Sequence, residues 1–198
     1  MRLDQQIAFL KEMDKLKRVI RQTHLVDGSR KENTAEHSWH IMIAAVTLAE
    51  YADEALDLLQ VMKLLLVHDI VEIDAGDTFA FDEVNYEDKP EREQRAAERL
   101  FGLLPDDQRE AFIALWHEFE AMNTNEARFA NAIDRLMPFL HNMWTDGAAS
   151  WKAHQPRFEQ VYQRNVGGVG SSSAVLWDYA QSLLQRAVDD GWLSPPEN

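Results

Sequence analysis

Cysteine is missing from this chain of 198 residues, and long hydrophobic runs and excess positive charge are missing too. Without cysteine, disulfide bonds and thiolate metal ligands are excluded, so any bound metal must take nitrogen and oxygen ligands. The longest apolar segment, residues 58–67, is interrupted by Gln60 and Lys63 and is too short to cross a bilayer. The N-terminal residues do not follow the pattern of a secretory signal. We therefore expect a cytoplasmic protein that does not bind membranes.

Positive charge is scarce, because 20 lysine and arginine residues stand against 34 aspartate and glutamate residues, for a formal net charge of −14. Binding to long nucleic acids is driven largely by cationic side chains that neutralise phosphates, so this balance argues against a nucleic-acid polymer as partner. A small phosphorylated substrate is compatible with the same balance, since it needs only a local cation and one or two arginines.

Apolar residues recur with the 3.6-residue period of helices almost throughout, and no convincing alternating strand is present. We therefore predict an all-α, single-domain helical bundle over residues 1–198, with a metal-site core at about 34–145 and C-terminal helices at 156–191 packed on it. Thr34 and Asn125 are the expected N-caps of two of its helices. The expected helices cover residues 3–21, 34–51, 56–73, 89–103, 105–122, 125–144 and 156–165, followed by a last helix that ends at Gly191.

Four polar residues stand on helical stripes that are otherwise apolar: His37, the neighbours His68 and Asp69, and Asp134. A carboxylate on a buried stripe costs free energy unless another charge compensates it, and one divalent cation would compensate both carboxylates. Two nitrogen and two oxygen ligands suit one Zn, Co, Mn or Mg ion, with positions left for water as in a catalytic site. The alternative is that each histidine is a core residue satisfied by one of the two aspartates.

Two further carboxylates adjoin this set. Glu72 follows His68 by four residues and Asp69 by three, hence on the same helical face, where it can hold and deprotonate a metal-bound water. Asp77 follows Gly76 at the mouth of the expected site. Taken alone, Glu72 is equally compatible with a solvated helix end and Asp77 with a turn or cap, but their grouping with the metal ligands favours catalysis.

Several motifs are spread in order over most of the chain: LKRV at 16–19, RKENTAEHSWH at 30–40, HDIVEIDAGD at 68–77 and AIDRLMPFLHN at 132–142. With these motifs the chain resembles the HD-domain metal-dependent phosphohydrolases, in particular the branch that contains bacterial 5′-deoxynucleotidases. The resemblance implies an HD-type helical fold, a homodimer and one divalent metal ion per chain. The metal ligands that it implies are His37, His68, Asp69 and Asp134. The catalytic carboxylates that it implies are Glu72 and Asp77, and Arg18 is implied as the residue that orients the phosphate.

The chain departs from that branch at two places on the expected substrate side. Val19 follows Arg18 where these deoxynucleotidases carry a tryptophan that helps to sense the sugar, and Thr78-Phe79 follows Asp77 in place of a leucine-proline pair. We therefore expect weak discrimination between deoxyribose and ribose. The residues expected to face the substrate are Arg18, Val19, Asp69, Asp77, Thr78 and Asp134.

Together these features predict an enzyme that hydrolyses nucleoside 5′-monophosphates, deoxyribonucleotides among them, to nucleoside and phosphate. The metal would lower the pKa of a water molecule, Glu72 would orient or deprotonate that water, and Arg18 would neutralise phosphate oxygens. Asp77 would either protonate the leaving 5′ oxygen or bind a sugar hydroxyl. The alternative within enzymes is an HD hydrolase of another phosphate ester or of a nucleoside triphosphate. The alternative outside enzymes is a metal-stabilised helical interaction module without turnover.

Overall fold

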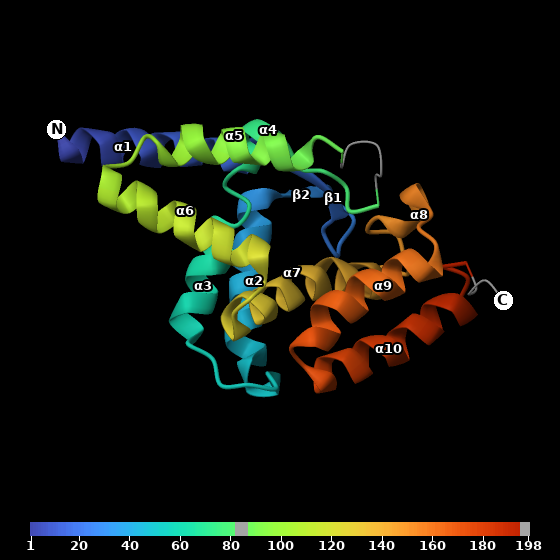
Figure 1. Ribbon diagram of the computed structural model, residues 1–198. Coiled ribbons are helices and arrows are strands. Elements are labelled where there is room, and N and C mark those ends of the chain that lie inside the picture. Colours follow the sequence, from blue (N-terminus) through green and yellow to red (C-terminus); the bar gives the residue numbers. More distant parts are fainter. Residues whose placement is uncertain (82–86, 195–198) are drawn as a thin grey trace.

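The computed structural model describes residues 1–81 and 87–194, and this part of the chain is mostly helical, with one antiparallel sheet of two short strands (Figure 1). The predicted all-α fold class is confirmed, with the small sheet as an addition. None of the helices in the described ranges is long and apolar enough to span a membrane. The elements are α1 (Arg2–Met13), η1 (Asp14–Arg18), β1 (Ile20–His24), β2 (Lys31–Asn33), α2 (Thr34–Leu48), η2 (Ala49–Tyr51), α3 (Leu58–Val67), α4 (Glu72–Ala75), α5 (Lys89–Phe101), α6 (Asp106–Ala121), α7 (Asn125–Trp144), α8 (Trp151–His154), α9 (Phe158–Gly168), η3 (Val169–Ser171) and α10 (Ala174–Asp189).

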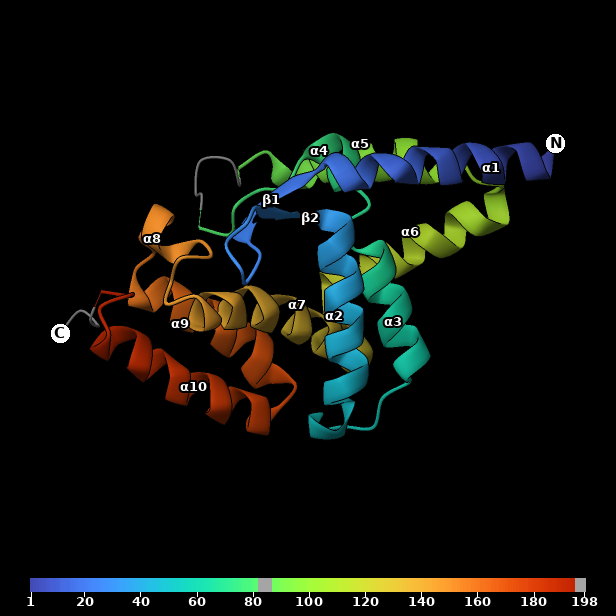
Figure 2. The same cartoon turned by 180° about the vertical axis from the view of Figure 1, so that it is seen from behind.

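Helix α7 is the centre of the bundle, because α2, α3, α6, α9 and α10 all pack on it. Phe129, Ile133 and Leu136 of this helix are fully buried in the larger of two apolar clusters. The second cluster joins Phe9 of α1 to the apolar faces of α5 and α6. Figures 1 and 2 show the result as two layers, with α1, α4 and α5 in one and α7, α9 and α10 in the other. The end of α3 and the beginning of α2 lie between these layers, which is where the polar residues of interest meet.

The predicted N-terminal helix over 3–21 is wrong beyond Met13. The chain continues as the short η1 turn and then leaves the helical direction at Val19, whose backbone is extended (φ −78°, ψ 115°). Residues 20–24 instead pair with β2 in an antiparallel hairpin, with Ile20 opposite Asn33. Valine, isoleucine and threonine favour extended backbone here, and Gly28 takes the positive φ of 70° in the connecting turn. The hairpin changes which side chains of this segment point inward.

The predicted helix over 56–73 is also wrong at its C-terminal end. Helix α3 ends at Val67, turns follow, and α4 begins only at Glu72 and ends at Ala75, followed by Gly76 with a φ of 77°. His68 and Asp69 therefore lie where the helix has ended, so that two adjacent side chains can turn toward one point.

Both predicted N-caps are displaced by one residue. Asn33, not Thr34, caps α2: its side chain accepts from the Glu36 amide while the Glu36 carboxylate accepts from the Asn33 amide. Thr124, not Asn125, caps α7. The C-terminal segments differ as well, because α9 continues to Gly168, beyond the predicted end at residue 165, and the short α8 was not predicted. Because Thr34 does not cap the helix, its hydroxyl group can donate a hydrogen bond to Glu72.

Candidate metal centre

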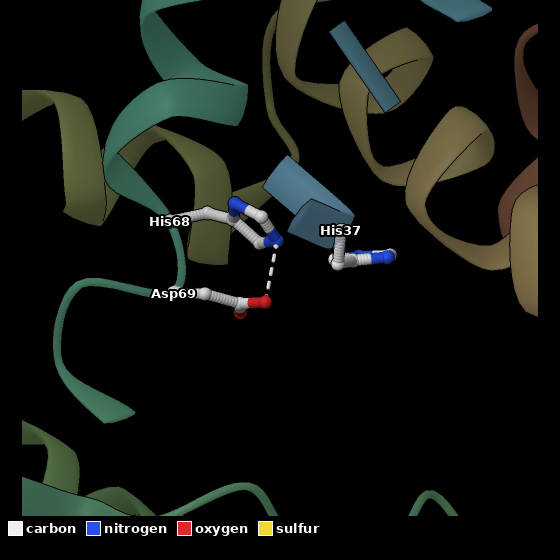
Figure 3. Close-up of side chains that lie close together, drawn as sticks. All are labelled: His37, His68 and Asp69. Atoms are coloured by element: carbon white, nitrogen blue, oxygen red, sulfur yellow. Dashed lines mark ion pairs between the residues drawn. The ribbon is translucent and has the colours of Figure 1, made fainter. Parts of the chain in front are cut away.

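The four predicted ligands come from three packed parts of the bundle. His37 lies in α2, His68 and Asp69 follow α3, and Asp134 lies in α7, and these three helices pack on one another. Both histidines are buried, with 2% and 4% of their surface exposed. Ligand atoms of His37, His68 and Asp69 all lie within 4.8 Å of one another, and Figure 3 shows the three side chains gathered at one place. Ligands of one ion at about 2.1 Å lie at most roughly 4.2 Å apart, so only small shifts are needed.

Asp134 joins this group through one oxygen that is near both histidines. Its Oδ1 lies 2.9 Å from His37 Nε2 and 3.7 Å from His68 Nε2, while Asp69 Oδ2 lies 3.0 Å from His68 Nε2. The alternative of two separate histidine–aspartate pairs corresponds to the two shortest of these distances, His37 to Asp134 and His68 to Asp69. Asp134 Oδ1 also lies near His68, so the two pairs adjoin at His68, where one shared cation would compensate both aspartates.

His68 tests whether these residues fit a cation. Its Nδ1 donates to the Leu65 carbonyl oxygen at 2.9 Å, which leaves Nε2 facing the two carboxylates. Buried Nε2 has no hydrogen-bond partner among the described residues, because the close Asp69 oxygen is not aligned for one. Burial lowers the pKa of His68, but Asp69 and Asp134 outweigh it and raise the pKa well above its usual value. The two carboxylates therefore favour a positive charge next to His68 Nε2, and a divalent cation would supply that charge.

Glu72 and Asp77 lie beside the cluster in an environment that favours their protonated forms. Burial and the neighbouring Asp69 raise the pKa of Glu72 well above its usual value, against the opposing effect of Arg21. Thr34 Oγ1 donates to Glu72 Oε2 at 2.9 Å and so fixes the direction of the carboxyl group. Burial also raises the pKa of Asp77. Carboxyl groups with raised pKa values beside a set of candidate metal ligands are suited to transfer protons in catalysis.

Arg21 is a cation that lies directly against the carboxylates of the site. Its Nη1 lies 3.2 Å from Asp69 Oδ2 and 3.8 Å from Asp77 Oδ1, and its Nε lies 3.4 Å from Glu32 Oε1. Burial opposes the charge of Arg21, but the carboxylates around it raise its pKa, so the guanidinium stays protonated. It reaches the cluster because it stands in β1 and not on a continuing helix.

Arg18 and Val19, which were predicted to face the substrate, lie elsewhere. Arg18 is exposed at the end of η1, and Val19 is half-buried. Neither is among the described residues that line the cavity over the cluster, whereas Arg21 and Gln22 both line it. The arginine of this segment that lines the cavity is therefore Arg21 and not Arg18, the residue that the resemblance implied.

That cavity has a volume of about 130 Å³. Its lining brings together all of the remaining substrate-side predictions, namely Asp69, Asp77, Thr78 and Asp134, and adds Glu72 and Lys89. A second cavity of about 890 Å³ adjoins it. The two share the lining residues Gln22, Asp77, Thr78, Phe79 and Phe81.

Glu32 is a buried carboxylate that the sequence did not single out. It is 2% exposed, and its Oε1 lies 3.6 Å from His37 Nδ1 and 3.4 Å from Arg21 Nε. It therefore stands between a proposed metal ligand and the site arginine, and it can orient both. The sequence carries no local signal for it, because β2 consists of three polar residues, and only the structure shows that Glu32 is the buried one.

Comparison with known proteins agrees with this geometry. The sequence model of a family described as HD domain matches residues 13–177. The human 5′-deoxynucleotidase HDDC2 is 31% identical over 165 residues, which cover 81% of this chain and 76% of the relative. The 5′-deoxynucleotidase hdd1 of Schizosaccharomyces pombe is 26% identical over 193 residues, which cover 95% of this chain and 86% of the relative.

Solved structures give the same result. A crystal structure of a predicted metal-dependent phosphohydrolase from Magnetospirillum magnetotacticum MS-1 is 52% identical, with a TM-score of 0.88 over 98% of this chain and 99% of the other. A conserved hypothetical protein from Pyrococcus furiosus has a TM-score of 0.61 at 19% identity, which shows a shared fold alone.

Proposed function

This chain belongs to the HD domain family, and on that premise we propose that it is a metal-dependent phosphohydrolase that cleaves nucleoside 5′-monophosphates, deoxyribonucleotides among them, to nucleoside and phosphate. One observation carries the proposal. Ligand atoms of His37, His68 and Asp69 lie within 4.8 Å of one another, Asp134 Oδ1 lies 2.9 Å from His37 Nε2, and an arginine and two protonatable carboxyl groups line the adjoining cavity. An interaction module without turnover would need neither the arginine nor the extra carboxyl groups.

His37, His68, Asp69 and Asp134 would hold the ion. A divalent ion held there supplies positive charge for the phosphate and lowers the pKa of water. Glu72, whose direction Thr34 fixes, takes the proton of the attacking water. As the bond from phosphorus to the 5′ oxygen breaks, Asp77 gives its proton to that oxygen, for which its raised pKa is suited.

Arg21 would bind the phosphate in the role first expected of Arg18. A guanidinium binds two phosphate oxygens at once, and the carboxylates that surround Arg21 keep it charged and in place. By the same shift of three residues, Gln22 and not Val19 is the neighbour that faces the cavity. The sugar would therefore meet the amide of Gln22 together with Thr78.

The proposal also covers the metal ion and the oligomeric state. We propose one ion of Mn, Co, Zn or Mg per chain, because nitrogen and carboxylate ligands suit all four. We also propose a homodimer, and an exposed apolar stripe on α2 supports it: Trp39, Ile43 and Val46 are each about half or more exposed. Light scattering of the purified protein measures the oligomeric state. The cytoplasmic location stays a sequence-based prediction.

Phosphate release tests the function. The purified chain is freed of metal, loaded in turn with Mn, Co, Mg or Zn, and given deoxyribonucleoside and ribonucleoside 5′-monophosphates, a 3′-monophosphate, a nucleoside triphosphate and a simple sugar phosphate. We expect turnover of the 5′-monophosphates with at least one metal and none without metal. Faster release from the triphosphate or from an unrelated ester would favour the alternative HD hydrolase.

A further inference from the structure

The cavity over the metal centre is too small for a whole nucleotide. Sites for molecules of this size span about 300–1,000 Å³, whereas this cavity holds about 130 Å³. The adjoining cavity of about 890 Å³ is large enough for a nucleoside. Because Asp77 and Thr78 line both, a phosphate over the metal centre would direct its nucleoside into the second cavity.

A stacked aromatic pair forms part of the wall of this second cavity. The rings of Phe79 and His154 lie 4.0 Å apart between centroids, with 27° between their planes, and Phe81 meets the edge of Phe79 at 5.4 Å. His154 is exposed and ends α8, whereas Phe79 is half-buried in the segment that follows Asp77. The pair thus joins the substrate side of the metal centre to α8, and the two segments lie side by side in Figures 1 and 2.

Helix α7 holds α8, which carries His154, in place through hydrogen bonds. Asn142 Oδ1 accepts hydrogen bonds from the amides of Ser150 and Trp151, each at 2.9 Å, and these residues begin α8. The Trp151 side chain is buried in the core. Helix α7 therefore carries a metal ligand, Asp134, and two turns later the amide that positions α8. Such fixed support lowers the entropy cost of binding a ring.

We propose that the stacked rings of Phe79 and His154 are the platform on which the nucleobase of the substrate lies. This inference rests on the proposed function and names the base-binding part of the same site. Stacking is tolerant of base identity because every base presents a flat π-face. The platform therefore predicts an enzyme that accepts purine and pyrimidine nucleotides with similar efficiency and gains much of its affinity from the base.

The test compares a nucleotide with its base-free counterpart. Wild type, Phe79→Ala and His154→Ala are assayed on deoxyadenosine 5′-monophosphate and on 2-deoxyribose 5-phosphate under one metal. A stacked base contributes about 1–3 kcal/mol, so we expect kcat/KM for the nucleotide to fall about 5- to 160-fold, with that for the sugar phosphate unchanged. Phe79→Tyr and His154→Phe keep a flat ring and should restore the nucleotide activity. His117→Ala is the matched control, because this exposed histidine is not among the lining residues described for either cavity.

Other outcomes overturn the platform. An equal loss on both substrates would mean that the rings only support the segment after Asp77, and no loss on either would mean that the base binds elsewhere. If the wild type hydrolyses neither compound, the proposed function fails, and calorimetric titration with deoxyadenosine then decides about the platform. Binding to the wild type that is lost in Phe79→Ala would support it, and no binding to the wild type would refute it.

Discussion

Replacing Arg21 by methionine should lower the free energy of unfolding by an amount that depends on bound metal, and it should lower turnover. Methionine keeps a long unbranched side chain but removes the charge that lies 3.2–3.8 Å from oxygens of Asp69, Glu32 and Asp77. The Arg21 side chain is only 12% exposed, so solvent screens these pairs weakly. Removing one partner of such a buried group costs about 3–5 kcal/mol. Without bound metal we therefore expect the free energy of unfolding to fall by about that amount.

The same substitution should cost less when metal is bound. A divalent ion compensates Asp69 and Asp134, and it is repelled by the nearby guanidinium. Because coupling between two bound charges is reciprocal, Arg21→Met should bind the metal more tightly than the wild type does. Its turnover should nevertheless fall. A hydrogen bond to a charged group is worth about 1.5–3 kcal/mol, which corresponds to a loss of roughly 10- to 100-fold in kcat/KM.

Denaturant unfolding with chelator and with saturating metal measures the two stabilities, calorimetry measures the metal affinity, and phosphate release measures kcat/KM. Arg18→Met is the matched control. Arg18 is exposed, so its loss should change stability by less than about 0.5 kcal/mol and leave turnover intact. Arg21→Lys, which keeps the charge, provides a folded variant if Arg21→Met unfolds without metal. An equal loss of stability with and without metal would refute the charge argument, and a loss of activity in Arg18→Met alone would refute the placement of the two arginines.

Three further predictions concern the carboxylates. Glu72→Gln should keep the metal, measured by metal analysis after gel filtration, but lose about 100-fold in kcat, the usual scale for an acid–base group; unchanged kcat would assign water activation to another residue. Glu32→Gln should weaken metal affinity in calorimetry by about tenfold or more through His37, whereas unchanged affinity would reduce Glu32 to a packing role. The pKa of Glu72 is raised in the folded chain, so the unfolded chain releases this proton first as the pH rises above 4.5. The free energy of unfolding therefore falls as the pH rises above 4.5. With chelator, Glu72→Gln should therefore be more stable than the wild type near neutral pH, and the gain should vanish below pH 4.5; a constant difference across this range would contradict the shift.

The helices were predictable where one local pattern decides them. Helix α7 spans Asn125–Trp144, as its apolar period indicates, because its whole length packs against other helices. The proposed metal ligands could be selected by the same reasoning, since His37, His68 and Asp134 interrupt apolar stripes and a buried polar group needs a partner. Both the period and its interruption are visible within a few turns of sequence.

The hairpin could not be found in this way. Ile20 stands where a continued first helix would place an apolar residue, so the helical period conceals the change to β1. What stabilises β1 is its pairing with β2 across the Gly28 turn, and that pairing is not a local property of either strand. Arg21 and Glu32 point into the site only because the hairpin forms, and for that reason neither was recognised.

The two kinds of element therefore have different parts in the site. Helices of the core position the proposed metal ligands, and these positions depend on the packing of the whole bundle, so we expect a change there to lower stability as well as metal affinity. Gln22 and Thr78 reach the same cavity from the hairpin and from the segment after α4, and both are only half-buried. Substitutions in these connecting segments can change which phosphate ester is accepted while His37, His68 and Asp134 stay in place. It follows that selectivity should be engineered from the hairpin and from the Phe79–His154 wall, and that changes on α2 and α7 should act on metal binding first.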